Sequence, residues 1–286
     1  MRFAFLTSTA NRHEADRIDA PLIAALHAKG VSVTQHAWDD LTDTLGDVDA
    51  AVVRTTWNYQ RQREQFLDRL KQVADTTTLI NPFELISWNT HKQYLCDLED
   101  QGVPVVPTVV VPRGSDTALS DIPFAHTSPE LVMKPAVGAG GRDVTRGTLT
   151  ALADRFVTLN SHEDVVIQPY IDGLEHTGET SVIVAAGSVT HAVNKKPPAN
   201  DFRAHERYGA KYRVHDATSA ERELAVWIVA QLQPAQPTCA RIDFIRDSYG
   251  TLYVSEVELT EPNLYLDLAP TAAKPLADAL YQRAKD

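Results

Sequence analysis

The chain has 286 residues, which predicts one or two compact domains, and its hydrophobic fraction of 43% and charged fraction of 23% are ordinary for a globular protein. Asp and Glu (38) outnumber Lys and Arg (27), so the formal net charge is −11 and neither nucleic acid nor an anionic membrane is an expected partner. The two cysteines, Cys96 and Cys239, are far apart and outside any CxxC pair, which excludes a disulfide scaffold and a cysteine-rich metal site.

The apolar stretches of the chain predict a cytoplasmic protein. The opening MRFAFLTSTA has too short an apolar run for a signal peptide. The longest apolar stretch, Val103–Pro112, is broken by prolines and is too short to span a bilayer. An anionic ligand of this acidic protein would therefore have to find a local basic pocket.

The first hundred residues alternate between strand and helix patterns. Apolar runs predict strands at Phe3–Thr7, Val31–Trp38, Ala50–Trp57 and Thr78–Asn81. Helical patterns are predicted at Ala15–Lys29, Arg61–Ala74 and Asn89–Glu99. The first helix is expected to stop at Gly30, since glycine is favoured just beyond a helix. This series predicts a small parallel sheet with helices on its faces.

The pattern changes at the proline-punctuated connector Val103–Pro112, which predicts a domain boundary. Strands are predicted beyond it at Glu130–Pro135, Val165–Ile171, Thr180–Ala185, Ser188–Asn194, Arg241–Arg246 and Leu252–Leu259. Helices are predicted at Thr150–Thr158, Ser219–Gln231 and Ala273–Lys285. A mixed, mostly antiparallel α+β unit fits this order of elements.

A lysine followed by a glycine turn is the first candidate for phosphate binding. Lys134 ends an apolar strand, and the turn Gly138–Gly141 follows it. Glycines let backbone N–H groups approach phosphate oxygens, and a lysine adds a point charge. The alternative is an ordinary surface loop beside a lysine whose stem lies on apolar surface. Neither a Walker A loop nor a GxGxxG turn after the first strand is present, so any nucleotide would be held in another way.

A hairpin near the end of the chain is the candidate metal site. A turn at Tyr249-Gly250 would pair Asp243 with Glu256 and Arg241 with Glu258, all on one face. Cross-strand neighbours lie about 5 Å apart at Cβ, and two carboxylates that close repel each other unless a cation neutralises them. Mg²⁺ prefers carboxylates together with substrate phosphates. The alternative is a solvated face carrying a surface ion pair that contributes little.

Two further segments suit a nucleotide. The strand Val165–Ile171 leads into Glu175 and Glu179, an arrangement that offers backbone groups for a planar base and a carboxylate for ribose, although a buried strand followed by a turn is the simpler interpretation. The basic stretch from Lys195 to Arg213 could close over a phosphate as a lid, or could be a solvated, mobile loop.

The loops after the first and third strands are the expected substrate site, because ligands of open α/β sheets bind at the carboxyl ends of the strands. Arg54 could hold a substrate carboxylate there and Glu14 an ammonium. The alternative for each residue is an exposed charge at a strand end.

Taken in order, these segments resemble the ATP-grasp ligase superfamily. The resemblance implies an N-terminal parallel α/β domain (residues 1–88) followed by two α+β lobes that clamp ATP (89–172 and 173–286). It implies phosphate contacts from Lys92, predicted on a helix, and from Lys134, with a glycine turn over the phosphates and a lid arginine. The residues matched to ATP binding are Lys92, Lys134, Gly138, Gly140, Gly141, Gln168, Tyr170, Ile171, Glu175 and Glu179. The residues matched to phosphoryl transfer are Lys134, Arg203 and Arg241, and those matched to Mg²⁺ or Mn²⁺ are Asp243, Glu256 and Glu258.

The position of Glu258 departs from the superfamily, which usually has asparagine there, and this puts the third metal ligand in doubt. Within the superfamily, Arg54–Tyr59 and Glu258–Tyr265 resemble a glutathione-synthetase-like branch, and the whole pattern is similar to the O-ureido-D-serine cyclo-ligases. The resemblance implies activation of a small amino-acid-derived carboxylate as an acylphosphate, then cyclisation of O-ureido-D-serine to D-cycloserine with release of ADP, phosphate, carbon dioxide and ammonia. An intermolecular ligase and a non-catalytic nucleotide-binding module are the alternatives, and a homo-oligomer stays open.

Overall fold

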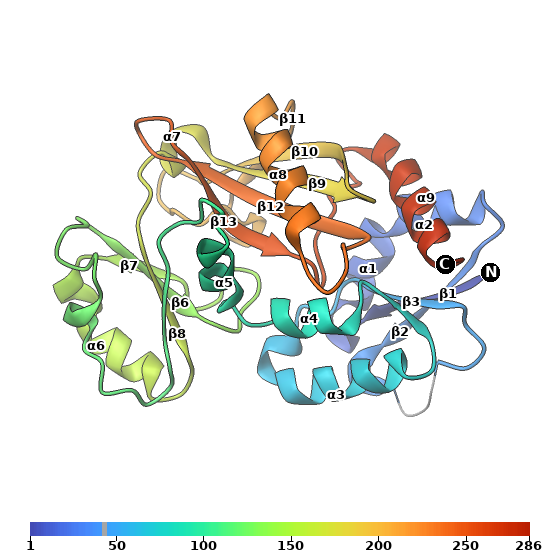
Figure 1. Ribbon diagram of the computed structural model, residues 1–286, viewed down its shortest axis with the longest axis horizontal. Coiled ribbons are helices and arrows are strands. Elements are labelled where there is room, and N and C mark those ends of the chain that lie inside the picture. Colours follow the sequence, from blue (N-terminus) through green and yellow to red (C-terminus); the bar gives the residue numbers. More distant parts are fainter. Residues whose placement is uncertain (42–44) are drawn as a thin grey trace.

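The computed structural model describes residues 1–41 and 45–286 (Figure 1). Within these residues the strands form three sheets, with the orders β2-β1-β3-β4, β5-β8-β6-β7 and β11-β10-β9-β12-β13. A parallel sheet comes first and two antiparallel sheets follow it, which is the order of units that the sequence predicted. None of the helices in the described part of the chain is long and apolar enough to cross a membrane.

The first sheet is parallel throughout, as the βαβ pattern predicted. Its strands are β1 (Arg2–Thr7), β2 (Ser32–Ala37), β3 (Ala50–Val53) and β4 (Thr78–Ile80). Its helices are α1 (Arg12–Ile18), α2 (Ala20–His27) and α3 (Arg63–Ala74). The prediction of one helix from Ala15 to Lys29 was wrong. Pro21, in the first turn of α2, has no N–H to donate and its ring crowds the preceding turn, so the helix breaks at Asp19.

The predicted helix Asn89–Glu99 was also wrong, because two helices occupy this region. These are α4 (Phe83–Asn89) and α5 (Tyr94–Asp100). The side chain of Asn89, at the end of α4, donates to the Val257 carbonyl at 2.7 Å and accepts from the Leu259 amide at 2.7 Å. Lys92 therefore lies in the turn between the helices and not on a helix.

The second sheet consists of β5 (Val109–Val111), β8 (Val165–Pro169), β6 (Leu131–Pro135) and β7 (Thr145–Gly147). Helix α6 (Leu149–Asn160) packs on it through Leu152, Phe156 and Leu159. The sequence patterns missed β7, a strand of three half-buried residues without apolar alternation.

The third sheet consists of β9 (Glu179–Ala185), β10 (Ser188–Lys196), β11 (Lys211–His215), β12 (Cys239–Arg246) and β13 (Leu252–Glu258). The short helix α7 (Leu174–Thr177) precedes it, and α8 (Ser219–Gln231) covers one face. Helix α8 begins where the sequence predicts, at a capping box in which Thr218 and Glu221 bond each other's backbone N–H groups. Short 3-10 turns lie at Thr9–Asn11, Trp38–Asp40, Tyr59–Arg61, Leu119–Asp121, Glu206–Tyr208 and Pro270–Ala272.

The last helix joins the first sheet to the third. Helix α9 (Ala273–Arg283) packs beside α2, far from it in sequence, near the N-terminus (Figure 1). Leu276 and Leu280 belong to the same buried cluster as Leu22 and Leu26, and this cluster continues into β9 through Ile183. The first and third sheets thus share one core, which fixes the position of the loops between them.

Candidate active site

A cleft of about 730 Å³ is lined by residues of the second and third sheets and by residues that follow β1 and β3 of the first sheet. This volume is typical of a small-molecule or cofactor site. It brings together most of the residues singled out in the sequence: Glu14, Lys92, Lys134, Gly138, Gly140, Gly141, Gln168, Tyr170, Ile171, Glu179, Arg203, Arg241, Glu256 and Glu258. Three predicted site residues, Arg54, Glu175 and Asp243, do not line it.

The hairpin of β12 and β13 has the predicted register. Arg241 lies opposite Glu258 and Asp243 opposite Glu256, with an irregularity in the pairing directly after Asp243. Arg241 Nη2 lies 2.6 Å from Glu258 Oε1 and 2.9 Å from Asp243 Oδ2. The predicted cross-strand pairs are therefore present, and Arg241 binds two of the three carboxylates.

Asp243 lies under the cleft floor and is 1% exposed. Its Oδ1 accepts from Ser181 Oγ at 2.6 Å and from Arg241 Nε at 2.9 Å, and its Oδ2 accepts from Lys195 Nζ and Arg241 Nη2, each at 2.9 Å. Burial alone would raise the pKa of Asp243, but Arg241 and Lys195 outweigh it and hold that pKa well below its usual value. Asp243 is therefore ionised and fully hydrogen-bonded.

The three carboxylates fit a hard divalent cation. One oxygen from each of Asp243, Glu256 and Glu258 can be chosen so that all lie within 4.8 Å of one another. Glu256 Oε2 and Glu258 Oε2 have no hydrogen-bond partner within the described residues, so both offer an open oxygen. Because four donors already saturate Asp243, a cation bound by all three carboxylates would have to displace Arg241 or Lys195 from it. Burial, together with the charges of Glu256 and Asp243, raises the pKa of Glu258 to about 7.

The two predicted phosphate lysines differ in their partners. Lys92 Nζ lies 2.5 Å from Glu256 Oε1, and that carboxylate outweighs burial and raises the lysine pKa. Lys134 has no carboxylate within 4.0 Å in the described residues, and burial together with the Lys92 charge lowers its pKa to about 8. Lys134 thus faces the cleft as a cation that lacks an anionic partner.

The glycine turn is covered by the segment that the sequence identified as a lid. Gly140 and Gly141 have φ of 63° and 69°, and a Cβ on Gly141 would approach the Tyr208 ring to 2.9 Å. Tyr208 donates from its hydroxyl to the Gly141 carbonyl at 3.1 Å, and the Arg203 guanidinium stacks on the Tyr208 ring at 3.4 Å. Arg203 is also bound by Asp201 at 2.6 Å, so it lies at the cleft with its charge paired.

The lid was predicted to extend from Lys195 to Arg213, and the position of Lys195 shows that this start is wrong. Lys195 lies in β10 and is 4% exposed, and its ammonium binds Asp243 at 2.9 Å and Glu179 at 2.6 Å. Burial alone would lower its pKa, but these two carboxylates raise it well above its usual value. Lys195 is a fixed part of the site, and the segment that covers the glycine turn begins after β10.

The expected base-binding strand lies along one wall of the cleft. Gln168 donates from its side chain to Thr108 Oγ1 at 2.8 Å, and the Tyr170 amide donates to the Glu130 carbonyl at 3.0 Å. The Ile171 amide has no hydrogen-bond acceptor within the described residues. Ile171 is therefore the linker residue whose N–H is free to bind the edge of a planar ring.

The two candidate ribose carboxylates are separated by the structure. Glu179 lines the cleft, where Lys195 and Ser255 each bind it at 2.6 Å. Glu175 lies outside, bound by Arg146 and by the Tyr170 hydroxyl. The prediction that placed Glu175 in the site is corrected, because α7 turns its side chain toward Arg146 at the surface.

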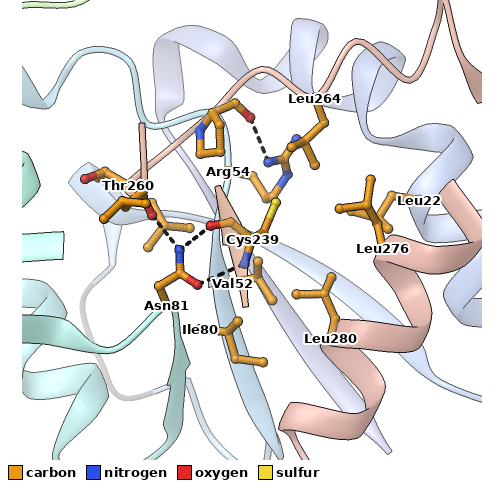
Figure 2. Close-up of a pocket in the computed structure, with 13 residues that line it drawn as sticks. Leu22, Val52, Arg54, Ile80, Asn81, Cys239, Thr260, Leu264, Leu276 and Leu280 are labelled. Atoms are coloured by element: carbon orange, nitrogen blue, oxygen red, sulfur yellow. Dashed lines mark hydrogen bonds between the residues drawn. The ribbon is translucent and has the colours of Figure 1, made fainter. Parts of the chain in front are cut away.

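Arg54 is buried in the interior instead of lining the cleft, which corrects its predicted contact with a substrate carboxylate. Arg54 lines a separate cavity of about 20 Å³, and Figure 2 shows Leu22 of α2 and Leu276 and Leu280 of α9 to one side of it. Its guanidinium binds Asp19 at 2.8 Å and donates to the Pro262 carbonyl at 3.0 Å. Both residues of the ion pair are almost fully buried, at 4% and 1% side-chain exposure, so Arg54 is not free to bind a ligand.

Sequence reasoning missed several cleft residues, of which Glu261 carries the most chemical information. Glu261 is 7% exposed and lines the cleft, and Tyr59, 4% exposed, lines the same end. Trp57, Asn58, Asn11 and Asn263 also contribute there. The sequence did contain a signal for Glu261. Glu256 and Glu258 were predicted to face the site from one strand, and Glu261 follows directly beyond the end of that strand.

The amino-acid sequence of the chain matches two protein families and several characterised relatives. The family "Prokaryotic glutathione synthetase, ATP-grasp domain" matches residues 104–269, and the family "D-cycloserine synthetase DcsG, N-terminal domain" matches residues 3–81. The chain is 32% identical to the cycloserine biosynthesis protein DcsG of Streptomyces lavendulae, over 93% of both chains. It is 27% identical to a glutathione synthetase of Prochlorococcus marinus (strain MIT 9313), over 75% of this chain and 66% of that protein.

Solved structures show the same relationship. The crystal structure of D-cycloserine synthetase DcsG has a TM-score of 0.89 and 30% identity, and the match covers 99% of this chain and 100% of that one. A D-alanine–D-alanine ligase of Bacillus anthracis complexed with ATP has a TM-score of 0.71 at 17% identity, over 100% of this chain and 97% of that one, and shares the fold alone. The matches extend over the parallel sheet and the cleft alike. The chain is an ATP-dependent ligase of the ATP-grasp superfamily, and it belongs to the D-cycloserine synthetase DcsG family.

Proposed function

We propose that the protein cyclises O-ureido-D-serine to D-cycloserine, using ATP and Mg²⁺ and releasing ADP, phosphate, carbon dioxide and ammonia. The observation that supports an anionic cosubstrate is Lys134, a cleft lysine that has no carboxylate partner among residues 1–41 and 45–286 and lies near a second lysine, Lys92. Two neighbouring cations favour a ligand with several negative charges, as a nucleotide triphosphate has. The similarity to cycloserine synthetases supports the choice of substrate.

The cleft supports an extended nucleotide. The free Ile171 amide suits the adenine edge, Glu179 lines the cleft near the expected ribose, and Lys92 and Lys134 lie where the phosphates would follow. The turn Gly138–Gly141 offers backbone N–H groups to the same phosphates. Arg203 would cover them from the loop after β10. The division into an N-terminal domain (1–88), a central lobe (89–172) and a C-terminal lobe (173–286) is part of this proposal.

The proposed reaction has two steps. The substrate carboxylate oxygen attacks the terminal phosphorus, the bond to ADP breaks, and ADP leaves with the electron pair. The nitrogen bonded to the side-chain oxygen then attacks the acyl carbon, phosphate leaves, and the nitrogen loses its proton as the five-membered ring closes. Water takes up the carbamoyl group, which becomes carbon dioxide and ammonia. Arg241 and Lys134 stabilise the charge on the phosphoryl and acyl oxygens in both steps.

The carboxylates of Asp243, Glu256 and Glu258 would hold the divalent cation, and Glu256 and Glu258 have the open oxygens for it. When bound, the cation neutralises charge on the phosphates. Lys92 lies against Glu256, which positions its ammonium at the side of the cleft where the phosphates end. Arg241 spans Asp243 and Glu258, and it keeps both contacts if the cation displaces Lys195 from Asp243.

The products separate this function from its alternatives. With O-ureido-D-serine as the sole acid, the enzyme is expected to release ADP and phosphate and to form a cyclic product, which chromatography and mass spectrometry identify. A strict requirement for a second amine would mean an intermolecular ligase. Pyrophosphate and AMP would mean attack at the α-phosphate and would contradict phosphoryl transfer. Binding of ATP without any product from a panel of amino-acid derivatives would favour a non-catalytic module.

Lys134→Ala is expected to lower kcat/KM for ATP about 30-fold or more, which corresponds to about 2 kcal/mol of lost transition-state stabilisation. The number of protons taken up when ATP binds gives a second test of this contact. The Lys134 pKa of about 8 should rise when phosphates arrive, so at pH 9 ATP binding takes up a proton in the native protein and less of one in the variant. Calorimetry in buffers of different ionisation enthalpy measures this uptake. Lys274→Ala, at an exposed lysine of α9, is the control, and an unchanged kcat/KM for Lys134→Ala would contradict the assignment.

A further inference from the structure

We propose that Glu261 is the ammonium-binding residue of the substrate site, and that its carboxylate holds the α-ammonium of the amino-acid substrate beside the reacting carboxyl group. This inference rests on the proposed function in so far as the substrate is an α-amino acid. It assigns the ammonium to Glu261 and not to Glu14, the residue that the strand-end argument had suggested.

The first observation is a buried carboxylate without a partner. Glu261 is 7% exposed and lines the cleft, yet its carboxylate has neither a hydrogen bond nor an ion pair within the described residues. The other acidic side chains of this wall have cations: Lys92 on Glu256 at 2.5 Å and Arg241 on Glu258 at 2.6 Å. Burying a carboxylate without a cation is unfavourable. A cationic ligand at this position would form the ion pair that no side chain of the described residues forms with Glu261.

The second observation is the rigid mounting of this residue. Trp57 Nε1 donates to the Glu261 carbonyl at 3.2 Å, and Arg54 donates to the Pro262 carbonyl at 3.0 Å. On the other side, the Thr260 amide donates to Asn89 Oδ1 at 3.2 Å. Side chains from the loop after β3 and from α4 thus fix the backbone on both sides of Glu261, which is what a preorganised binding group requires.

The third observation is position. The nitrogen and the carboxyl carbon of an α-amino acid are bonded to the same carbon, so they are about 2.5 Å apart. The ammonium site must therefore adjoin the place where the carboxylate reacts. Glu261 is suited to this position because it lines the same cleft as Arg241 and lies three residues after Glu258, which binds Arg241. Glu14 is less suited, since its side chain is 44% exposed and lies 4.0 Å from Arg17.

The contact would also govern which nitrogen reacts. An α-amine kept protonated has no lone pair and cannot attack the activated carboxyl group. When Glu261 holds this amine in its protonated form, the nitrogen bonded to the side-chain oxygen remains able to attack the acyl carbon. Attack by that nitrogen closes the ring and does not join two substrate molecules. Glu261 is then a specificity-determining residue as well as a binding one.

The test compares two probes: O-ureido-D-serine and 3-(ureidooxy)propanoic acid, which lacks only the α-amino group. The native protein is expected to prefer the amino probe by about 10- to 100-fold in kcat/KM for ADP release, as a charge-assisted hydrogen bond implies. Glu261→Gln, of the same size, should lose most of this preference while its KM for ATP stays unchanged. Glu261→Asp, which keeps the charge, should retain part of it. Glu223→Gln, at an exposed position of α8, serves as the surface control.

Three results would overturn the proposal: a native protein that does not distinguish the probes, a Glu261→Gln variant that keeps the full preference, or loss of the preference in Glu14→Gln instead. Calorimetric binding of both probes with a non-hydrolysable ATP analogue separates this inference from the proposed function. If no ADP is released with either probe, cyclisation fails. A binding preference that Glu261→Gln abolishes would nevertheless support the ammonium site.

Discussion

Glu256→Gln is expected to reduce turnover by about 10³-fold while the protein stays folded. Glu256 faces the cleft, neutralises Lys92 at 2.5 Å and has an open oxygen toward the other two carboxylates. Glutamine keeps the size and can still accept from Lys92, but it has no charge to attract a divalent cation. Removing one preorganised charge at the site of phosphoryl transfer costs about 10²–10³ in rate, and weaker cation binding adds to this loss.

The dependence on Mg²⁺ identifies the cause. The concentration of Mg²⁺ that gives half-maximal turnover should rise in Glu256→Gln, and thermal unfolding should show that the fold is retained. Glu223→Gln, exposed on α8, should behave as the native protein does. Near-native turnover of Glu256→Gln at low Mg²⁺ would remove the metal site from this hairpin. Asp243 is a poorer position for this test, since its removal would leave Lys195 and Arg241 buried without their shared carboxylate.

Arg54→Ala is expected to lower the free energy of unfolding by about 3–5 kcal/mol, the usual cost of breaking a buried ion pair from one side. The substitution leaves the Asp19 carboxylate buried without its cation and the Pro262 carbonyl without its donor. Urea denaturation measures the loss. Replacing both residues of the pair, as Arg54→Met with Asp19→Leu, should cost less than Arg54→Ala alone, because no uncompensated charge remains.

The pH dependence of the Arg54→Ala defect follows from Asp19. Burial already raises the pKa of Asp19 in the native protein, and loss of Arg54 removes the charge that opposes this rise. The folded variant then binds a proton at a pH where the unfolded chain does not, so the variant loses stability as pH rises and regains it toward acid pH. A defect that is small and independent of pH would contradict the role of this pair.

The hairpin of the site could be predicted from sequence because its information is local. Alternation along β12 and β13, with a turn between them, determines which residues face each other. The predicted pairs, Arg241 with Glu258 and Asp243 with Glu256, are confirmed by the register of the two strands. The parallel direction of the strands in the first sheet was predictable for a similar reason, since helix patterns follow its first and third strands.

The placement of Arg54 and Lys195 was not predictable in this way. Each is a charged residue whose burial depends on partners distant in the chain: Asp19 and Pro262 for Arg54, Asp243 and Glu179 for Lys195. A sequence pattern shows a charge at a strand end or in a basic stretch, and charges there are usually exposed. The pairing of β9, β10 and β12 within the third sheet encloses Lys195, and the packing of the segment after β13 against the first domain encloses Arg54.

The packing of α9 against α2 bears on how substrate specificity can be exchanged between relatives. Leu276 and Leu280 of α9 cover Leu22 and Leu26 of α2, so the helix layer of the first sheet is completed by residues near position 280. A recombination event that replaced residues 1–88 alone would place a foreign α2 against the resident α9, and their side chains would have to fit again. The amino-acid sequences of α2 and α9 are therefore expected to change together among relatives, although the two helices lie at opposite ends of the chain.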